Sequence, residues 1–216
     1  MTELTYFQNV RSDIGPLLKG QPRRILDVGC GAGATLAWLK QRWPEAETMG
    51  IDGYAPVLPE LEKNADKAMI LDLEQPLPDL GTFDLVLALD VLEHLRDPWA
   101  AAQRLADLVG PSGAMIASVP NVANQKVLMP LLLKGEFRYL DAGLLDRTHL
   151  RFFDERSAIE LVEGTGLTIT GGVAVMGRRQ RFQDRLTLGL LQRHFINQYV
   201  MRAERQGRRF SGWLKL

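Results

Sequence analysis

The chain has 216 residues, of which 46% are hydrophobic and 24% charged, and it carries one cysteine and no net charge. These values are typical of a soluble globular protein and exclude an internal disulfide, so we expect a reducing, cytoplasmic setting. No apolar run approaches the roughly 18–20 residues of a membrane span, and the N-terminus lacks the layout of a signal peptide.

Short apolar runs alternate with helical patterns through the first 120 residues. The predicted strands are 24–28, 46–52, 67–73, 83–90 and 113–120. The predicted helices are 33–43, which Pro44 stops, and 98–110, which Gly110 and Pro111 end. Such alternation predicts a doubly wound α/β fold, with a parallel sheet and helices on both faces.

From 121 to 153 this rhythm breaks, and apolar clusters mix with Gly, Asp and Arg. The segment is long for a plain connection, so we predict an insertion with short helices that acts as a lid or substrate wall. A helix at 154–166 follows, with Asp154 or Ser157 as its cap, and then a strand at 167–177 that is bulged at Gly171-Gly172.

The end of the chain is basic. Residues 178–216 carry 10 basic and 2 acidic residues, whereas residues 1–177 carry 16 and 24. Apolar residues at helical spacing predict a basic amphipathic helical tail over 178–205, and the last residues could return as an edge strand. We therefore divide the chain into a domain at 1–177 and a tail at 178–216.

The tail has three readings. It could pack on its own domain or on a second subunit as a homodimer, lie on an anionic membrane, or contact another protein. The acidic body and the lack of a recognition motif argue against nucleic acid.

A glycine-rich turn follows the first strand in "RRILDVGCGAGATLAWLK", where Asp27 precedes Gly29, Gly31 and Gly33. Glycines at the carboxyl end of a parallel strand let the backbone approach a ligand closely. The G-x-G-x-G spacing differs from the dinucleotide fingerprint, and no triphosphate-binding loop is present. The turn therefore predicts a nucleotide-like cofactor.

Acidic residues end the next two strands. Asp52 closes the second strand, where a carboxylate can accept both hydroxyls of a ribose. Asp72 and Leu73 close the third, where a carboxylate can accept from an adenine amino group.

The order "ILDVGCGAG … GIDGY … ILDLEQPLP … FDLVLALDVLEHLRDP … GPSGAMIASVPN" resembles the class I S-adenosylmethionine-dependent methyltransferases. "GEFRYLDAGLLDRTHLRFFD" resembles a subgroup associated with bacterial surface-glycan biosynthesis, whose leader helix Tyr6 and Arg11 also fit. The resemblance implies a Rossmann-like, mostly parallel sheet of about seven strands in the order 3-2-1-4-5-7-6. The basic tail stands where the antiparallel strand seven is expected, so that strand stays uncertain.

The resemblance implies S-adenosyl-L-methionine as cofactor, with S-adenosyl-L-homocysteine as product. The cofactor-binding residues that it implies are Asp27, Gly29, Cys30, Gly31 and Gly33 for the methionine portion, Asp52 with Gly53 and Tyr54 for the ribose, Asp72 and Leu73 for the adenine, and Leu89 and Asp90 near the sulfonium.

Two histidines lie where catalysis is expected. We predict His149 as the general base, because its ordinary pKa suits proton transfer, with Asp146 to orient it. Alternatively, His149 ties the insertion to the sheet by hydrogen bonds. Asp90, Glu93 and His94 resemble a metal-binding arrangement of quinone-biosynthesis O-methyltransferases, although the same residues can cap a helix.

The predicted function is O-methylation of a sugar hydroxyl in a surface glycan or its precursor. Alternatives are O-methylation of a quinone or other small metabolite, a cofactor-binding scaffold without turnover, and a nicotinamide-dependent oxidoreductase. The spacing of Asp52 favours the oxidoreductase and the glycine spacing opposes it. The predicted location is cytoplasmic, with peripheral contact at the inner face of the membrane as a variant.

Overall fold

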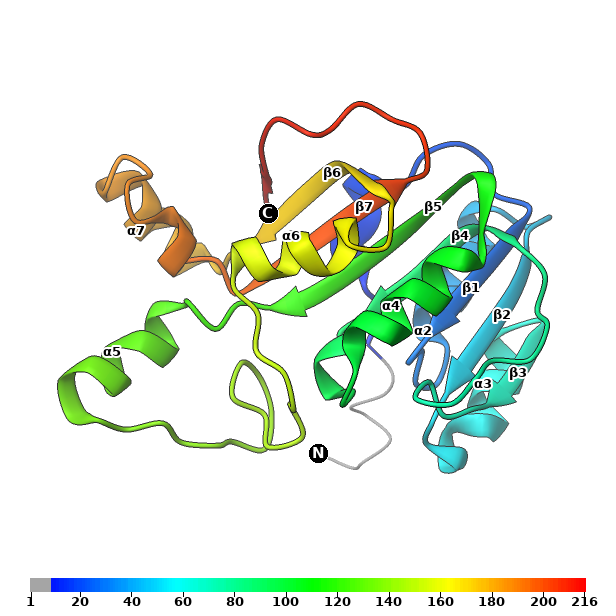
Figure 1. Cartoon of the computed structure of the whole chain (residues 1–216), viewed down its shortest axis with the longest axis horizontal. Coiled ribbons are helices and arrows are strands. Elements are labelled where there is room, and N and C mark those ends of the chain that lie inside the picture. The colour runs from blue at the N-terminus through cyan, green and yellow to red at the C-terminus, as the bar shows by residue number, and fades with distance from the viewer. Residues whose placement is uncertain (1–8) are drawn as a thin grey trace.

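Eight strands form one sheet in the computed structural model, which describes residues 9–216 (Figure 1). Tyr6 lies outside the described residues. The strands are β1 (Arg24–Val28), β2 (Glu47–Asp52), β3 (Lys67–Ile70), β4 (Phe83–Leu89), β5 (Val109–Pro120), β6 (Thr168–Val175), β7 (Gln198–Glu204) and β8 (Leu214–Lys215). The α-helices are α2 (Ala34–Arg42), α3 (Leu58–Asn64), α4 (Pro98–Asp107), α5 (Gln125–Lys134), α6 (Glu155–Glu163) and α7 (Arg178–Leu186). Short 3-10 helices are η1 (Ser12–Leu17), η2 (Ala55–Val57), η3 (Leu92–His94) and η4 (Gln192–His194).

The strand order is β3-β2-β1-β4-β5-β7-β6-β8. Strands β1 to β5 are parallel to one another, β7 is antiparallel to β5 and β6, and β8 runs parallel to β6. The predicted Rossmann-like order 3-2-1-4-5-7-6 is confirmed, and a two-residue edge strand extends it.

The helix predicted over 178–205 is wrong after α7. Leu188 and Gly189 both have positive φ, at 51° and 79°, which ends the helix, and β7 then inserts between β5 and β6. Tyr199 and Met201 pack into the core on one face of the sheet, while Val200 packs on the other. This period of two is the signature of a strand, and it supplies the strand seven that the basic tail had put in doubt.

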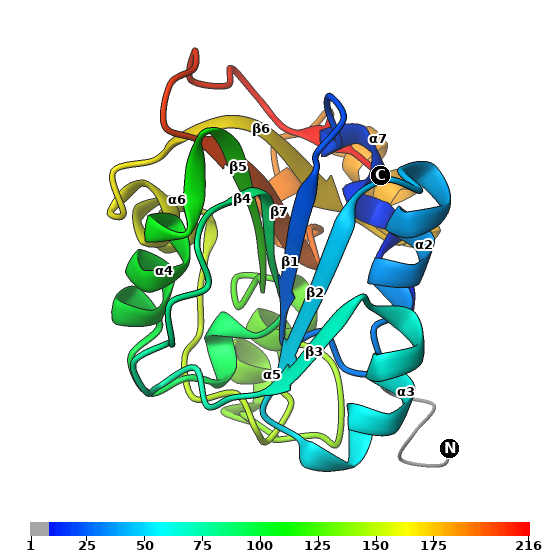
Figure 2. The same ribbon diagram turned by 90° about the vertical axis from the view of Figure 1, so that its right-hand side faces the viewer.

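Helices cover both faces of the sheet, as Figure 2 shows. Leu36 and Leu39 of α2 and Leu61 of α3 share one core with residues of η1. The opposite core is formed by α4 and α6, and its members include Leu105 and Leu161. Because both faces are covered, four of the five residues of β1 are buried, as expected for an inner parallel strand.

Local sequence signals set several boundaries. Asp154 and Ser157 form a capping box that starts α6, as predicted. The bulge in β6 lies between Ile169 and Gly171, just before the predicted Gly171-Gly172. Two elements end earlier in the chain than predicted. The third strand stops at Ile70 rather than at 73, and α4 stops at Asp107 because β5 begins two residues later.

The insertion at 121–153 begins and ends at one place. Asn121 and Phe153 form an isolated bridge, and the amide of Val122 donates to the carbonyl of Phe153 at 2.8 Å. Helix α5 opens the insertion, and a long loop returns below the carboxyl end of the sheet (Figure 1). Over residues 9–216, no helix combines the length and the apolar composition that crossing a membrane requires.

Candidate functional site

The glycine turn after β1 needs all three glycines for backbone reasons. Gly29, Gly31 and Gly33 have φ of 66°, 54° and 78°, in the left-handed region that side chains disfavour. A Cβ on Gly29 would lie 2.6 Å from Cγ2 of Val91, and one on Gly33 would lie 2.7 Å from Cδ1 of Leu61. The turn therefore packs tightly against its own chain, which fixes its shape before any ligand binds.

Asp52 ties this turn to the end of β2. Its carboxylate accepts the amide of Gly31 at 2.7 Å and the amide of Tyr54 at 2.8 Å. A carboxylate has about four lone-pair sites, so two remain for further donors. Gly53 and Tyr54 are exposed beside it. This donor and acceptor set fits a ribose at the end of β2.

Asp27 is buried at the end of β1, 3% exposed. Burial raises the pKa of its carboxyl to about 8, the charge of Asp52 adds to this, and the Arg11 guanidinium opposes it. At neutral pH much of the carboxyl is therefore protonated. A cationic group such as the ammonium of a bound methionine would favour its ionised form, so Asp27 fits its predicted place.

Asp72 and Leu73 lie in the turn that follows β3. The Asp72 carboxylate accepts the amide of Glu74 at 2.8 Å, and the buried Leu73 accepts from Arg104 at 2.6 Å through its carbonyl. The adjoining Leu71 amide donates to the carbonyl of Asp52. Both predicted residues thus stand at the cofactor edge, and their adenine contacts stay predictions.

Cys30 sits inside the glycine turn, partly buried. Burial raises the pKa of its thiol, and the charges of Asp27 and Asp52 raise it further. A protonated thiol is a poor nucleophile, so Cys30 is not a candidate nucleophile.

Asp90 is the centre of a polar network that the sequence did not predict. Its φ is 55°, and its carboxylate accepts from Arg11 at 2.8 Å, from the Ser118 hydroxyl at 2.8 Å, and from Gln198. Arg11 also bonds the side chain of Gln198. The network joins the segment before η1 to the ends of β4, β5 and β7. Leu89, by contrast, is buried in the core.

Gln198 can be recognised as a site residue only when residues 198–204 are known to form a strand. In the antiparallel register, Gln198 pairs with Pro120 at the end of β5, which brings its side chain to the site. A helix at this position gives no such pairing. The leader-helix resemblance is the one sequence signal for Arg11. No sequence pattern indicates that Ser118 belongs to the site.

A cavity of about 450 Å³ lies between the carboxyl edge of the sheet and the insertion. All the predicted catalytic and metal candidates line it. The lining residues that the site uses are Asp90, Glu93, His94, Lys126, Asp146, His149, Asn197 and Gln198. Residues of the insertion therefore line one side of this cavity, and their role as a substrate wall stays a prediction.

His149 is 8% exposed and faces the cavity. Burial lowers the pKa of its imidazole, the neighbouring His94 lowers it further, and Asp146 opposes both. The ring of His94 meets it edge-on, with centroids 4.8 Å apart. His149 is therefore neutral near pH 7, the form that accepts a proton.

Asp146 acts on the loop backbone more than on the imidazole. Its carboxylate accepts the amide of Thr148 at 2.9 Å and the Thr148 hydroxyl at 2.7 Å. Its carbonyl accepts the amide of His149 at 3.0 Å. The prediction that Asp146 orients His149 thus rests on the turn and on its charge, because no bond from its carboxylate to the ring is found in residues 9–216.

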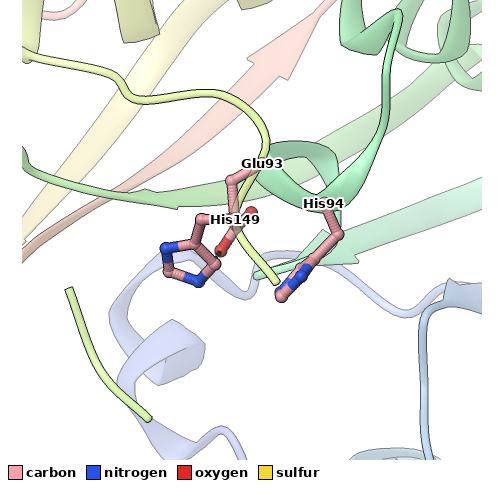
Figure 3. A group of neighbouring side chains, drawn as sticks. All are labelled: Glu93, His94 and His149. Carbon is pink, nitrogen blue, oxygen red and sulfur yellow. Dashed lines mark ion pairs between the residues drawn. The ribbon is translucent and has the colours of Figure 1, made fainter. Parts of the chain in front are cut away.

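Glu93, a predicted metal candidate, lies buried in the cavity wall. It is 1% exposed, and neither carboxylate oxygen has a hydrogen-bond partner within the described part of the chain. Burial raises the pKa of its carboxyl well above the usual range. Its Oε1 lies 4.0 Å from Nε2 of His149 (Figure 3).

Glu93, His94 and His149 each offer one ligand atom, and these atoms lie within 4.8 Å of one another. Figure 3 shows the three side chains converging from η3 and from the returning loop of the insertion. This set differs from the predicted metal candidates, because Asp90 is engaged with Arg11 and His149 takes its place.

A family model described as a methyltransferase domain matches residues 5–171. Among curated relatives, a ubiquinone biosynthesis O-methyltransferase of Azorhizobium caulinodans is 36% identical over 104 residues, which are 45% of this chain and 40% of that protein. Another, from Rhodopseudomonas palustris strain BisB5, is 30% identical over 156 residues, or 68% and 59% of the two chains. A trans-aconitate 2-methyltransferase of strain BisB18 is 29% identical over 102 residues, 46% and 40%. The chain thus spans about half the length of these relatives.

Solved structures share the fold at low identity. A SAM-dependent methyltransferase of Thermotoga maritima matches with a TM-score of 0.63 at 13% identity, covering 94% of this chain and 90% of that one. The N-methyltransferase NodS of Bradyrhizobium japonicum, solved with S-adenosyl-L-homocysteine, matches with a TM-score of 0.57 at 15% identity, covering 94% and 83%.

Proposed function

Since the matched model covers most of it, the chain belongs to the methyltransferase-domain family, and we propose that it transfers a methyl group from S-adenosylmethionine to an acceptor hydroxyl. The predicted methyltransferase fold is confirmed, and the predicted enzyme class and cofactor agree with the family. The family match favours this activity over the nicotinamide-dependent oxidoreductase.

One observation carries the proposal: a neutral, buried His149 faces a cavity beside the cofactor edge. The cofactor supplies an already activated methyl group. The chain must hold the acceptor in line, exclude water and take the acceptor's proton. His149 accepts that proton at its ring nitrogen, and the insertion lines one side of the cavity.

The acceptor has two candidate classes. The segment that contains Asp146 and His149 resembles the surface-glycan subgroup, which supports a sugar hydroxyl of a surface glycan or its precursor as the acceptor. The names of the ubiquinone biosynthesis relatives support a quinone or another small metabolite. The predicted homodimer and the cytoplasmic location stay predictions.

An acceptor panel tests the proposal. The purified protein is incubated with S-adenosylmethionine and sugars, phenolic quinone precursors, amines or carboxylic acids, and mass spectrometry follows the methylated products. We expect methyl transfer to a hydroxyl. Transfer to amines or carboxylates alone would refute O-methylation, and cofactor binding without any product across the panel would favour the scaffold.

We also infer a second role for the same side chains, as ligands of a divalent cation. The unpartnered carboxylate of Glu93 beside His94 and His149 supports this role, because a buried carboxylate without a partner is costly. A cation there would acidify the acceptor hydroxyl. His149 would then be a ligand through one ring nitrogen, which could not also serve as the base.

Calorimetric titration of the chelator-treated protein with Mn²⁺ or Zn²⁺ separates the two roles without measuring turnover. A metal site predicts stoichiometric binding that His94→Gln abolishes and that His194→Gln, which lies outside the cavity, leaves intact. Full turnover after exhaustive chelation, with no binding heat, would leave His149 as the base.

A further inference from the structure

Helix α7 buries two polar side chains and exposes two apolar ones among its arginines. Gln180 and Asp184 are buried, where Gln180 donates to Asn197 at 2.7 Å and Asp184 pairs with Lys215. Phe182 is 62% exposed and Leu186 is 69% exposed. A surface helix of a soluble domain has the opposite arrangement, so the exposed apolar residues of α7 are suited to contact something outside the chain.

Helix α5 and the segment after α7 also expose apolar side chains. Both helices project from the end of the sheet on the same side (Figure 1), and Gln125 donates to Gln183 at 3.0 Å between them. We name the exposed surface of the two helices and this segment the α5–α7 face. Its exposed apolar residues are Met129, Leu132, Leu133, Phe182, Leu186, Leu188 and Leu190. Contiguous exposed apolar patches mark interaction sites.

Unpaired cations border this face. Residues 178–195 contain five arginines and a single acidic residue, Asp184, which is already paired with Lys215. The arginines of α7, at 178, 179, 181 and 185, are exposed and form no ion pair with any residue in the range 9–216. Helix α5 adds Lys126 and Lys134 and no acidic residue.

We propose that the α5–α7 face docks on an anionic membrane surface. Leucines and a phenylalanine beside arginines are the composition of helices that lie in the headgroup region of a bilayer. Each basic residue near an anionic leaflet adds attraction. A second copy of this chain is a poorer occupant, because a two-fold contact would bring the same unpaired arginines together.

The face also leads to the acceptor cavity. A groove of about 620 Å³ between α5 and α7 is lined by Lys126, Arg178 and Arg179, and Lys126 lines the acceptor cavity as well. An acceptor carried by a lipid with an anionic headgroup would therefore meet cations between the membrane and His149. This consequence rests on the proposed function, whereas docking itself does not.

Vesicle sedimentation of the full chain tests the proposal. We expect binding to vesicles of phosphatidylcholine with 30% phosphatidylglycerol, weaker binding as salt rises, and little binding to phosphatidylcholine alone. Leu188→Ser with Leu190→Ser should weaken binding by at least about tenfold, since these side chains are 89% and 84% exposed. Arg178→Gln with Arg179→Gln and Arg181→Gln should weaken it similarly.

Two controls keep the test specific. Arg23→Gln removes an exposed arginine just before β1, at the opposite end of the sheet, and Trp99→Ser removes an exposed apolar residue of α4. Both should bind vesicles like the parent chain. The proposal would be overturned if the control variants lost binding equally or if the parent chain did not bind anionic vesicles. It would also be overturned if light scattering showed dimers that become monomers only in the leucine variant. None of these outcomes bears on methyl transfer to a soluble acceptor.

Discussion

Two regions along the carboxyl edge of the sheet differ in how many of their polar groups already have hydrogen-bond partners. Around β1 to β3, Asp52 holds the turn through backbone amides, and Gly29 and Gly33 pack against neighbouring side chains. Under the insertion, Glu93 is buried without a hydrogen-bond partner among residues 9–216, and two histidines face a cavity. In the first region the polar groups already hold the turn in shape, whereas in the second region polar groups remain available to bind or react with an acceptor. Variants in the first should therefore change binding and folding, and variants in the second should change turnover.

The largest effect is expected at the acceptor cavity. His149→Gln should lower kcat by roughly 10²–10⁴-fold, the usual contribution of a positioned base, while the affinity for S-adenosylhomocysteine stays the same. Steady-state rates and calorimetry on one preparation check both. His194→Gln serves as control, and unchanged turnover of His149→Gln would remove it from the mechanism.

The next effect is expected at the glycine turn. Gly29→Ala places a Cβ 2.6 Å from Val91 at a φ of 66°, which should cost about 2–5 kcal/mol of unfolding free energy through backbone strain and overpacking. Gly135→Ala is a matched control, because its φ of 67° is similar but no atom lies within 4 Å. It should cost only the strain, about 1–2 kcal/mol. Equal costs, measured by urea unfolding, would contradict the packing account.

Asp27 should make folding depend on pH. Its pKa of about 8 lies above its unfolded value, so between pH 4 and 8 the folded chain holds a proton that the unfolded chain has lost. Stability should therefore fall as pH rises through this window, by up to about 1.4 kcal/mol per unit, and level off above pH 8. Asp27→Asn should remove this slope, and an unaltered slope would place its origin elsewhere.

The smallest effect is expected at Cys30. Cys30→Ala removes a partly buried thiol that stays protonated, so we expect unchanged kcat and a loss of stability of about 1 kcal/mol or less. A large loss of turnover would show that the thiol takes part in the reaction.

The same contrast explains what the sequence could predict. The first region depends on local order along the chain: a strand, a glycine turn and an aspartate near each strand end. The positions of Asp27 and Asp52 at the carboxyl edge could therefore be predicted, and their cofactor contacts stay predictions. The acceptor side depends on distant pairings. Gln198 reaches Asp90 only because β7 runs antiparallel beside β5, and the apolar residues around it have a spacing that also fits a helix.

The metal candidates show this limit most clearly. Asp90, Glu93 and His94 are neighbours in sequence, but Arg11 draws Asp90 into another network, and His149 returns from the insertion to face Glu93. Spacing along one segment cannot reveal a third ligand that arrives from more than fifty residues away.

Calorimetric titration with S-adenosylhomocysteine tests the division between the two regions most directly, with NADH as the control ligand. We predict that the parent chain and His149→Gln bind S-adenosylhomocysteine equally and that Asp52→Ala binds much more weakly. None of the three should bind NADH. Equal binding by Asp52→Ala, or loss of binding in His149→Gln, would contradict the assignment of the cofactor to the β1–β3 edge.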